Sequence, residues 1–141
     1  MEILSINDLN DTEKRLVEVA FVAREKAYSP INNIYIGAAV FDSKGEITPG
    51  ANYGISSGLN ICAERAAIVT ANSFGHFEIT KLALASQGDE PLVSCGPCRQ
   101  FIFETGKRSG IVIQIFSSNK DGSIIKRFTI DELYPFPYSR K

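Results

Sequence analysis

The residues Cys95, Gly96, Pro97 and Cys98 place two thiols three positions apart, and Cys62 is the only other cysteine in the 141-residue chain. A closely spaced pair of thiols either exchanges disulfides or binds a metal ion. An odd number of cysteines is not typical of a disulfide framework. These three residues therefore pose a choice between redox chemistry and metal chemistry.

A redox pair would use Cys95 and Cys98 and would leave Cys62 without a role. Thioredoxin-like loops commonly carry Trp before the first cysteine, whereas this chain has no Trp. Such loops also usually follow the first strand of their domain, but this one lies beyond the middle of the chain. These features argue against the redox interpretation.

Two kinds of zinc site agree better with three cysteines. A structural site needs four ligands, and His76, the only histidine, would complete a Cys3His set. A catalytic site needs three protein ligands and leaves the fourth position to water. Glu64 stands two positions after Cys62, where it could transfer protons beside that water. The combination Cys-x-Glu and Cys-x-x-Cys therefore favours catalytic zinc, with the structural site as an alternative.

Hydrophobic periodicity and turn residues predict alternating helices and strands. Helices are expected at 11–27, 62–75, 95–106 and 130–135, strands at 34–41, around 47, at 79–86, 111–118 and 124–130, and a loop at 48–60. This order predicts one α/β domain over residues 1–141, a sandwich with a mixed β-sheet flanked by helices. Cys62 and Cys95 would begin two of the helices, so both helix starts could meet at one end of the sheet.

Composition excludes several classes of partner. The formal net charge is −1 and the basic residues are scattered, which argues against a nucleic acid polymer. The longest apolar run, 34–41, is too short for a membrane span. The first residues do not resemble a signal peptide, so a cytoplasmic location is expected.

Several segments resemble the cytidine deaminase family, in its small single-domain class. "GLNICAERAAI" and "SCGPCRQFIFET" are similar to its two signature segments, "IYIGAAV" to its F-x-V-G-A-A strand and "DELYP" to its closing helix. The resemblance runs in order from about Tyr28 to Pro135. It implies a three-layer sandwich and a hydrolytic deaminase that converts cytidine, deoxycytidine or a cytidine-like nucleoside to the uridine form with release of ammonia.

The resemblance also implies roles for particular residues. Zn²⁺ would be held by Cys62, Cys95 and Cys98, and Glu64 would carry protons. The backbone of Ala63 would contact the pyrimidine edge. Small members of the family are tetramers, so a homotetramer is expected.

Two arginines lie beside cysteines in the sequence, and each could bond a thiolate and offset its charge. Arg65 matches a family arginine with this role. Arg99 could instead be a surface or interface residue. The partner implied overall is a small-molecule nucleoside or a related aminopyrimidine.

The residues that read the substrate depart from the family. Its N-x-E-N stretch grips the sugar hydroxyls, but without a gap the Asn and Glu positions hold Ala51 and Tyr53. A one-residue deletion places Asn52 at the Asn and Gly54 at the Glu. Asn52 and Tyr53 are thus the candidates for substrate binding, and the family's glutamate is absent either way.

Two further positions differ. Ser94 stands where the family has Pro, and Ile34 replaces a Phe of the pocket wall. Blasticidin S deaminase also has Tyr in place of that glutamate, so a modified aminopyrimidine such as blasticidin S is the alternative substrate. The alternative of another class is a zinc-stabilised binding domain without catalysis.

Overall fold

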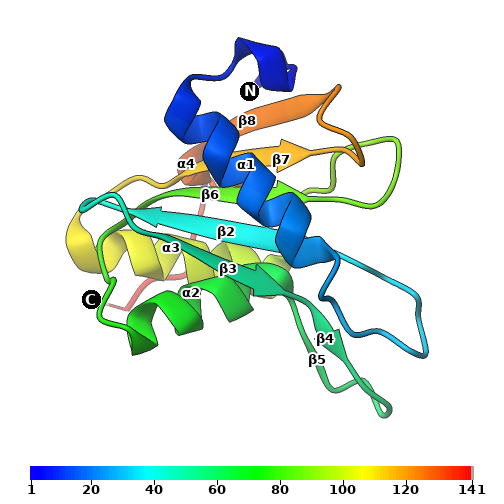
Figure 1. Cartoon of the computed structure of the whole chain (residues 1–141). Coiled ribbons are helices and arrows are strands. Elements are labelled where there is room, and N and C mark those ends of the chain that lie inside the picture. The colour runs from blue at the N-terminus through cyan, green and yellow to red at the C-terminus, as the bar shows by residue number, and fades with distance from the viewer. Residues whose placement is uncertain (141) are drawn as a thin grey trace.

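The computed structural model describes residues 1–140, in which six strands form one mixed sheet (Figure 1). Its order is β1-β8-β7-β6-β2-β3, and only β6 and β7 are parallel. The strands are β1 (Glu2–Leu4), β2 (Gly37–Asp42), β3 (Ile47–Ala51), β6 (Ile79–Ala85), β7 (Gln114–Ser118) and β8 (Ile125–Thr129). Two short strands, β4 (Tyr53–Gly54) and β5 (Asn60–Ile61), make a separate hairpin between β3 and the next helix.

Helices cover both faces of the sheet, which confirms the expected three layers. The helices are α1 (Asp11–Arg24), α2 (Ala63–Ser73), α3 (Gly96–Ser109) and α4 (Ile130–Leu133), with a short 3₁₀ helix at Ile6–Asp8. One hydrophobic cluster joins α1 to the sheet, and a second joins α2, α3 and α4 to the opposite face. Figure 1 shows α1 lying across the face turned away from α2 and α3.

The two clusters follow from the alternation of side chains along each strand. In β6, Leu82 and Leu84 pack toward α2 and α3, whereas Ala83 and Ala85 pack toward α1. All four side chains are at most 1% exposed. The sheet therefore has no solvent-facing side at its centre, in agreement with the near-continuous apolar sequence of β6.

The first turn of α2 lies unusually close to the edge strand β3. A Cβ atom added to Gly50 would stand 2.3 Å from the backbone nitrogen of Ala67 and 2.7 Å from the carbonyl oxygen of Ala63. Only glycine permits this approach. Gly50 thereby sets the position of the helix that begins after Cys62.

Several predicted boundaries were wrong. The segment 48–60 is not all loop, because β3 continues through Pro49 and Gly50 and the β4–β5 hairpin follows. Proline is tolerated there since β3 is an edge strand. The helix expected at 11–27 ends at Arg24, and the strand expected at 34–41 begins only at Gly37.

The third helix was also predicted too short. It does not end at Gly106 but continues to Ser109, and Gly110, with φ 69°, closes it. Gly106 is needed for packing, because an added Cβ would lie 2.3 Å from the carbonyl oxygen of Ile111. Strand β1, which pairs with β8, was not predicted. Across residues 1–140, every helix is too short or too polar to cross a membrane.

Candidate metal centre and active site

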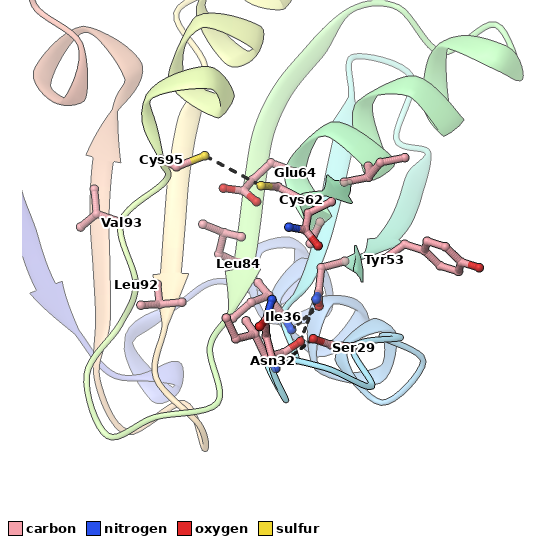
Figure 2. A pocket seen from close by; sticks show the side chains of 15 residues that line it. Ser29, Asn32, Ile36, Tyr53, Cys62, Glu64, Leu84, Leu92, Val93 and Cys95 are labelled. Carbon is pink, nitrogen blue, oxygen red and sulfur yellow. Dashed lines mark hydrogen bonds between the residues drawn. The ribbon is translucent and has the colours of Figure 1, made fainter. Parts of the chain in front are cut away.

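The N-termini of α2 and α3 meet, as the sequence predicted, and bring the three cysteines together. Cys62 is the N-cap residue of α2, Cys95 is the N-cap residue of α3, and Cys98 lies in the first turn of α3. The sulfur atoms of Cys62 and Cys95 are 3.8 Å apart, and all three sulfurs lie within 4.8 Å of one another. Figure 2 shows the Cys62 and Cys95 side chains directed toward each other.

This group has the geometry and chemistry of a zinc site. Sulfurs bound tetrahedrally to zinc at about 2.3 Å are separated by about 3.8 Å. Thiolates are soft ligands that suit zinc. The two helix N-termini also direct partial positive charge toward the sulfurs. Cys62, Cys95 and Cys98 are therefore positioned to bind a zinc ion. The distance between the sulfurs of Cys62 and Cys95 equals the one expected for two ligands of the same zinc.

His76 does not belong to this group. It follows the end of α2, whereas Cys62 precedes its beginning. The imidazole Nδ1 of His76 lies 3.2 Å from Oδ2 of Asp42, at the end of β2. The Cys3His structural site is accordingly not formed, and the group of candidate metal ligands in residues 1–140 consists of three sulfurs.

The surroundings raise the pKa of one thiol of the group and of the guanidinium beside another. Burial, and after it the negative charge of Glu64, raises the pKa of the Cys98 thiol. Nη2 of Arg65 donates a hydrogen bond to the sulfur of Cys62 over 3.5 Å, and this bond raises the pKa of the guanidinium. A bound cation would stabilise the thiolate form of all three cysteines.

Glu64 lies in the first turn of α2 with its carboxylate beside the sulfurs. The residue is 5% exposed, yet its carboxylate makes no hydrogen bond or ion pair within residues 1–140. Figure 2 shows the carboxylate directed toward the space between Cys62 and Cys95. A carboxylate that faces a cavity and has no protein partner is available to exchange protons with a molecule bound there.

A cavity of about 250 Å³ opens onto Glu64, Cys62 and Cys95. Its walls are mainly apolar, which suits a flat heteroaromatic ring. Apolar side chains on these walls come from Ile34, Ile36, Leu84, Leu92 and Val93. The cavity thus places a ring-sized space directly beside the candidate proton carrier and metal ligands.

The residues predicted to bind substrate lie differently around this cavity. Ala63 lines it beside Cys62 and is 1% exposed. The amide of Asn52 is committed to the protein: its Oδ1 accepts from Ile36 N–H and its Nδ2 donates to the Ile34 carbonyl, both over 2.7 Å. These two bonds fix the amide in the wall of the cavity, which Asn52 also lines, and its contact with a substrate stays a prediction.

Tyr53 borders the cavity, but its ring is directed away from it (Figure 2). The ring packs against Tyr28 with the two centroids 5.1 Å apart, and Tyr53 is 52% exposed. In this arrangement its phenol does not point toward the space beside Glu64.

Arg99 does not bond a thiolate, contrary to one of the two expectations for it. Its Nε donates to the Ser94 carbonyl over 2.7 Å, and its Nη1 donates to the Leu133 carbonyl over 3.1 Å. Arg99 thus ties the start of the Cys95 loop to the end of α4. The Ser94 hydroxyl is buried and has no hydrogen-bond partner within residues 1–140.

Three polar residues of the cavity were not found from the sequence: Ser29, Asn32 and Asn60. Ser29 and Asn32 precede β2, and Asn60 lies two positions before Cys62. The only sequence signal for Asn60 was its place within the segment that resembles a family signature.

Comparisons with known proteins agree with this site. The family described as the cytidine and deoxycytidylate deaminase zinc-binding region matches residues 10–114. A cytidine deaminase of Halalkalibacterium halodurans is 34% identical over 121 residues, which cover 85% of this chain and 89% of that protein. A cytidine deaminase of Sporosarcina psychrophila is 33% identical over 132 residues, which cover 93% of each.

A solved structure is similar as well. The crystal structure of cytidine deaminase from Burkholderia pseudomallei superposes with a TM-score of 0.81 at 32% identity, over 88% of this chain and 97% of that one. The shared sheet and helices position the cysteine group in this chain. The chain therefore belongs to the zinc-dependent cytidine and deoxycytidylate deaminase family.

Proposed function

We propose that this protein hydrolyses the 4-amino group of cytidine, deoxycytidine or a cytidine-like nucleoside, with Cys62, Cys95 and Cys98 as zinc ligands and Glu64 as the proton carrier. One observation carries the proposal: the unpartnered carboxylate of Glu64 and three converging sulfurs share one end of an apolar cavity. The cytidine deaminases among its relatives support the choice of substrate.

Proton transfer by Glu64 accounts for the reaction without a second acid or base. Zinc, when bound, supplies a Lewis acid that lowers the pKa of a water molecule. Glu64 accepts a proton from the attacking water as its oxygen bonds to C4 of the ring, and it donates that proton to ring N3. Glu64 then carries the remaining proton of the new hydroxyl to the amino group. The C4–N bond breaks, ammonia leaves, and a 4-oxo group remains.

The cavity walls orient the ring for this transfer. Ala63 stands between Cys62 and Glu64 in sequence and lines the cavity, which supports a contact between its backbone and the pyrimidine edge. Ile36 and Leu84 offer apolar contacts to the ring faces. Such a site excludes water from the reacting atoms and strengthens the electrostatic interactions there.

The charge of three thiolates would weaken zinc as a Lewis acid, and Arg65 offsets part of it. Its hydrogen bond to Cys62 places a guanidinium beside the ligand sulfur, and its Nη2 also lies 3.4 Å from the Asn60 carbonyl. The N-terminal dipoles of α2 and α3 act in the same direction.

The proposal includes a homotetramer. Large apolar side chains in the β4–β5 hairpin and at the end of α2 are exposed, among them Leu59 at 65%, Ile61 at 51% and Phe74 at 74%. Phe136 is 92% exposed in a segment that bonds back to α3 two residues later, where Gln100 donates to the Tyr138 carbonyl. Sedimentation at micromolar concentration should give four times the chain mass, and a monomer would contradict this part of the proposal.

A reducing compartment such as the cytoplasm fits three free thiols that must stay reduced to bind metal. There the reaction would serve pyrimidine salvage.

Ammonia release from the zinc-loaded protein tests the activity directly. Cytidine and deoxycytidine should both be deaminated, with one zinc per chain. If blasticidin S is deaminated and neither nucleoside is, the same mechanism acts on a modified aminopyrimidine and the proposed substrate is wrong. Bound zinc without turnover of any aminopyrimidine would instead indicate a binding domain without catalysis.

A further inference from the structure

The reaction geometry determines which part of the cavity meets the substituent of the substrate. C4 and N1 lie on opposite sides of a pyrimidine ring. A ring whose C4 faces Glu64 and the cysteines therefore directs N1 away from them. The β4–β5 hairpin leads directly into Cys62, and Asn60 lies two residues before it. Asn60 borders the same cavity as Cys62, and two residues of extended chain separate them by about 7 Å.

Because Gly54 has no side chain, the side chain of Asn60 can occupy the space beside it. The two residues are paired across the hairpin. A Cβ atom added to Gly54 would lie only 2.7 Å from Oδ1 of Asn60 and 3.6 Å from Oγ of Ser29. The absent side chain thus makes room for an amide and a hydroxyl beside the same point of the cavity.

These polar groups are available to a ligand. The side-chain amide of Asn60 makes no hydrogen bond within residues 1–140, whereas the oxygen and the nitrogen of the Asn52 amide each bond one backbone group. Ser29 is 5% exposed, and its Oγ accepts from Ile34 N–H over 3.2 Å, which leaves its O–H to donate elsewhere. The ring of Tyr53 packs against Tyr28 and is directed away from the cavity in Figure 2, so its phenol does not compete for this position.

We propose that Asn60 is the specificity-determining residue for the group at N1, where its neutral amide bonds the hydroxyls of the sugar. This assignment rests on the proposed deaminase function of the same cavity. An amide both donates and accepts hydrogen bonds, so it can pair with a hydroxyl in either role. A sugar without those hydroxyls leaves the amide unpaired, and the substrate is then bound less tightly.

The test compares cytidine with 2′,3′-dideoxycytidine in the zinc-loaded protein and its variants. Asn60→Ala should lower kcat/KM for cytidine about two- to tenfold and leave the dideoxy analogue within about twofold. Ser56→Ala, in the same hairpin but outside the cavity lining, is the matched control and should change neither value. Zinc content and Tm should match the wild type in both variants.

Two results would overturn the assignment. An equal loss on both substrates would mean that Asn60 supports the structure without reading the sugar. A selective loss in Asn32→Ala, with none in Asn60→Ala, would assign the contact with the sugar to Asn32, another polar residue of the cavity lining.

Binding of the product separates this inference from the proposed function. If the wild type turns over neither nucleoside, the proposed function fails, and calorimetry with uridine and 2′,3′-dideoxyuridine still tests Asn60. Weaker binding of uridine alone to Asn60→Ala, by about two- to tenfold, would support the assignment. Equal binding by wild type and variant, or no binding at all, would contradict it.

Discussion

The side-chain amide of Asn52 bonds the backbone on both sides of Tyr35, since it accepts from Ile36 N–H and donates to the Ile34 carbonyl. The backbone N–H of Asn52 also donates to the Ile36 carbonyl over 3.2 Å. These bonds join the end of β3 to the approach to β2, where Ile34 and Ile36 form part of the cavity wall.

Asn52→Asp should destabilise the protein. The carboxylate keeps an acceptor for Ile36 but turns a second oxygen toward the Ile34 carbonyl, where a donor is lost. The expected cost is about 1–3 kcal/mol, which corresponds to a fall in Tm of roughly 3–9 °C for a domain of this size. Asn60→Asp is the matched control, because that amide has no protein partner to lose. Equal Tm values for both variants would show that the Asn52 bonds do not support the wall.

Zinc content should depend on the three cysteines and not on the histidine. Cys95→Ala and Cys98→Ala should each lose most of the metal, since two remaining thiolates make an incomplete site. His76→Ala should keep one zinc per chain, because its imidazole pairs with Asp42 outside the sulfur group. Metal analysis after dialysis measures this, and zinc loss in His76→Ala would revive the four-ligand site.

The affinity for zinc should fall as the pH is lowered. Because the pKa of the Cys98 thiol is raised by burial, this group is protonated in the metal-free protein and must release its proton to bind zinc. The proton competes more strongly at lower pH, so the zinc affinity should drop at least about tenfold per pH unit. Competition with a chelator between pH 6 and pH 8 measures the slope. A flat profile would contradict proton release on binding.

Gly50→Ala should weaken both the fold and the metal site. The new methyl group would meet the backbone of α2 at 2.3 Å and push its first turn, with Cys62 and Glu64, away from β3. Overpacking of this kind costs about 1–3 kcal/mol. Gly88→Ala is the control, because an added Cβ there meets nothing within 4 Å. Urea unfolding and zinc content of both variants provide the comparison, and equal stability would argue against the close approach.

The sequence predicted the layers and the metal ligands because these depend on strong local signals. A short, mostly apolar segment such as 79–86 favours a buried strand, and cysteines before Ala-rich or Pro-led segments are typical of helix starts. The convergence of Cys62 with Cys95 and Cys98 followed from those starts. Whether Glu64 acts on a substrate there stays a prediction until it is measured.

The side chains that read the substrate could not be predicted in the same way. The sequence pointed to Asn52 as a substrate-binding residue, but it could not show that its amide also bonds the backbone at 34–36, because only the folded chain brings these residues together. Gly50 and Gly106 look like turn residues in the sequence, yet both allow close packing inside regular elements. The side chain of Asn60 has room beside the cavity because Gly54 is its partner across the hairpin, and the spacing of residues in the sequence does not reveal this pairing.

The central claim is that Glu64 carries protons beside a zinc ion it does not bind, and Glu64→Gln tests it most directly. The amide keeps the shape of the side chain but cannot accept the proton of the attacking water. We expect kcat for cytidine to fall by about 10²- to 10⁴-fold, while zinc stays at one per chain. Glu78→Gln, an exposed change outside the cavity, should leave both values unchanged. A Glu64→Gln protein with full zinc and near wild-type kcat would contradict the account.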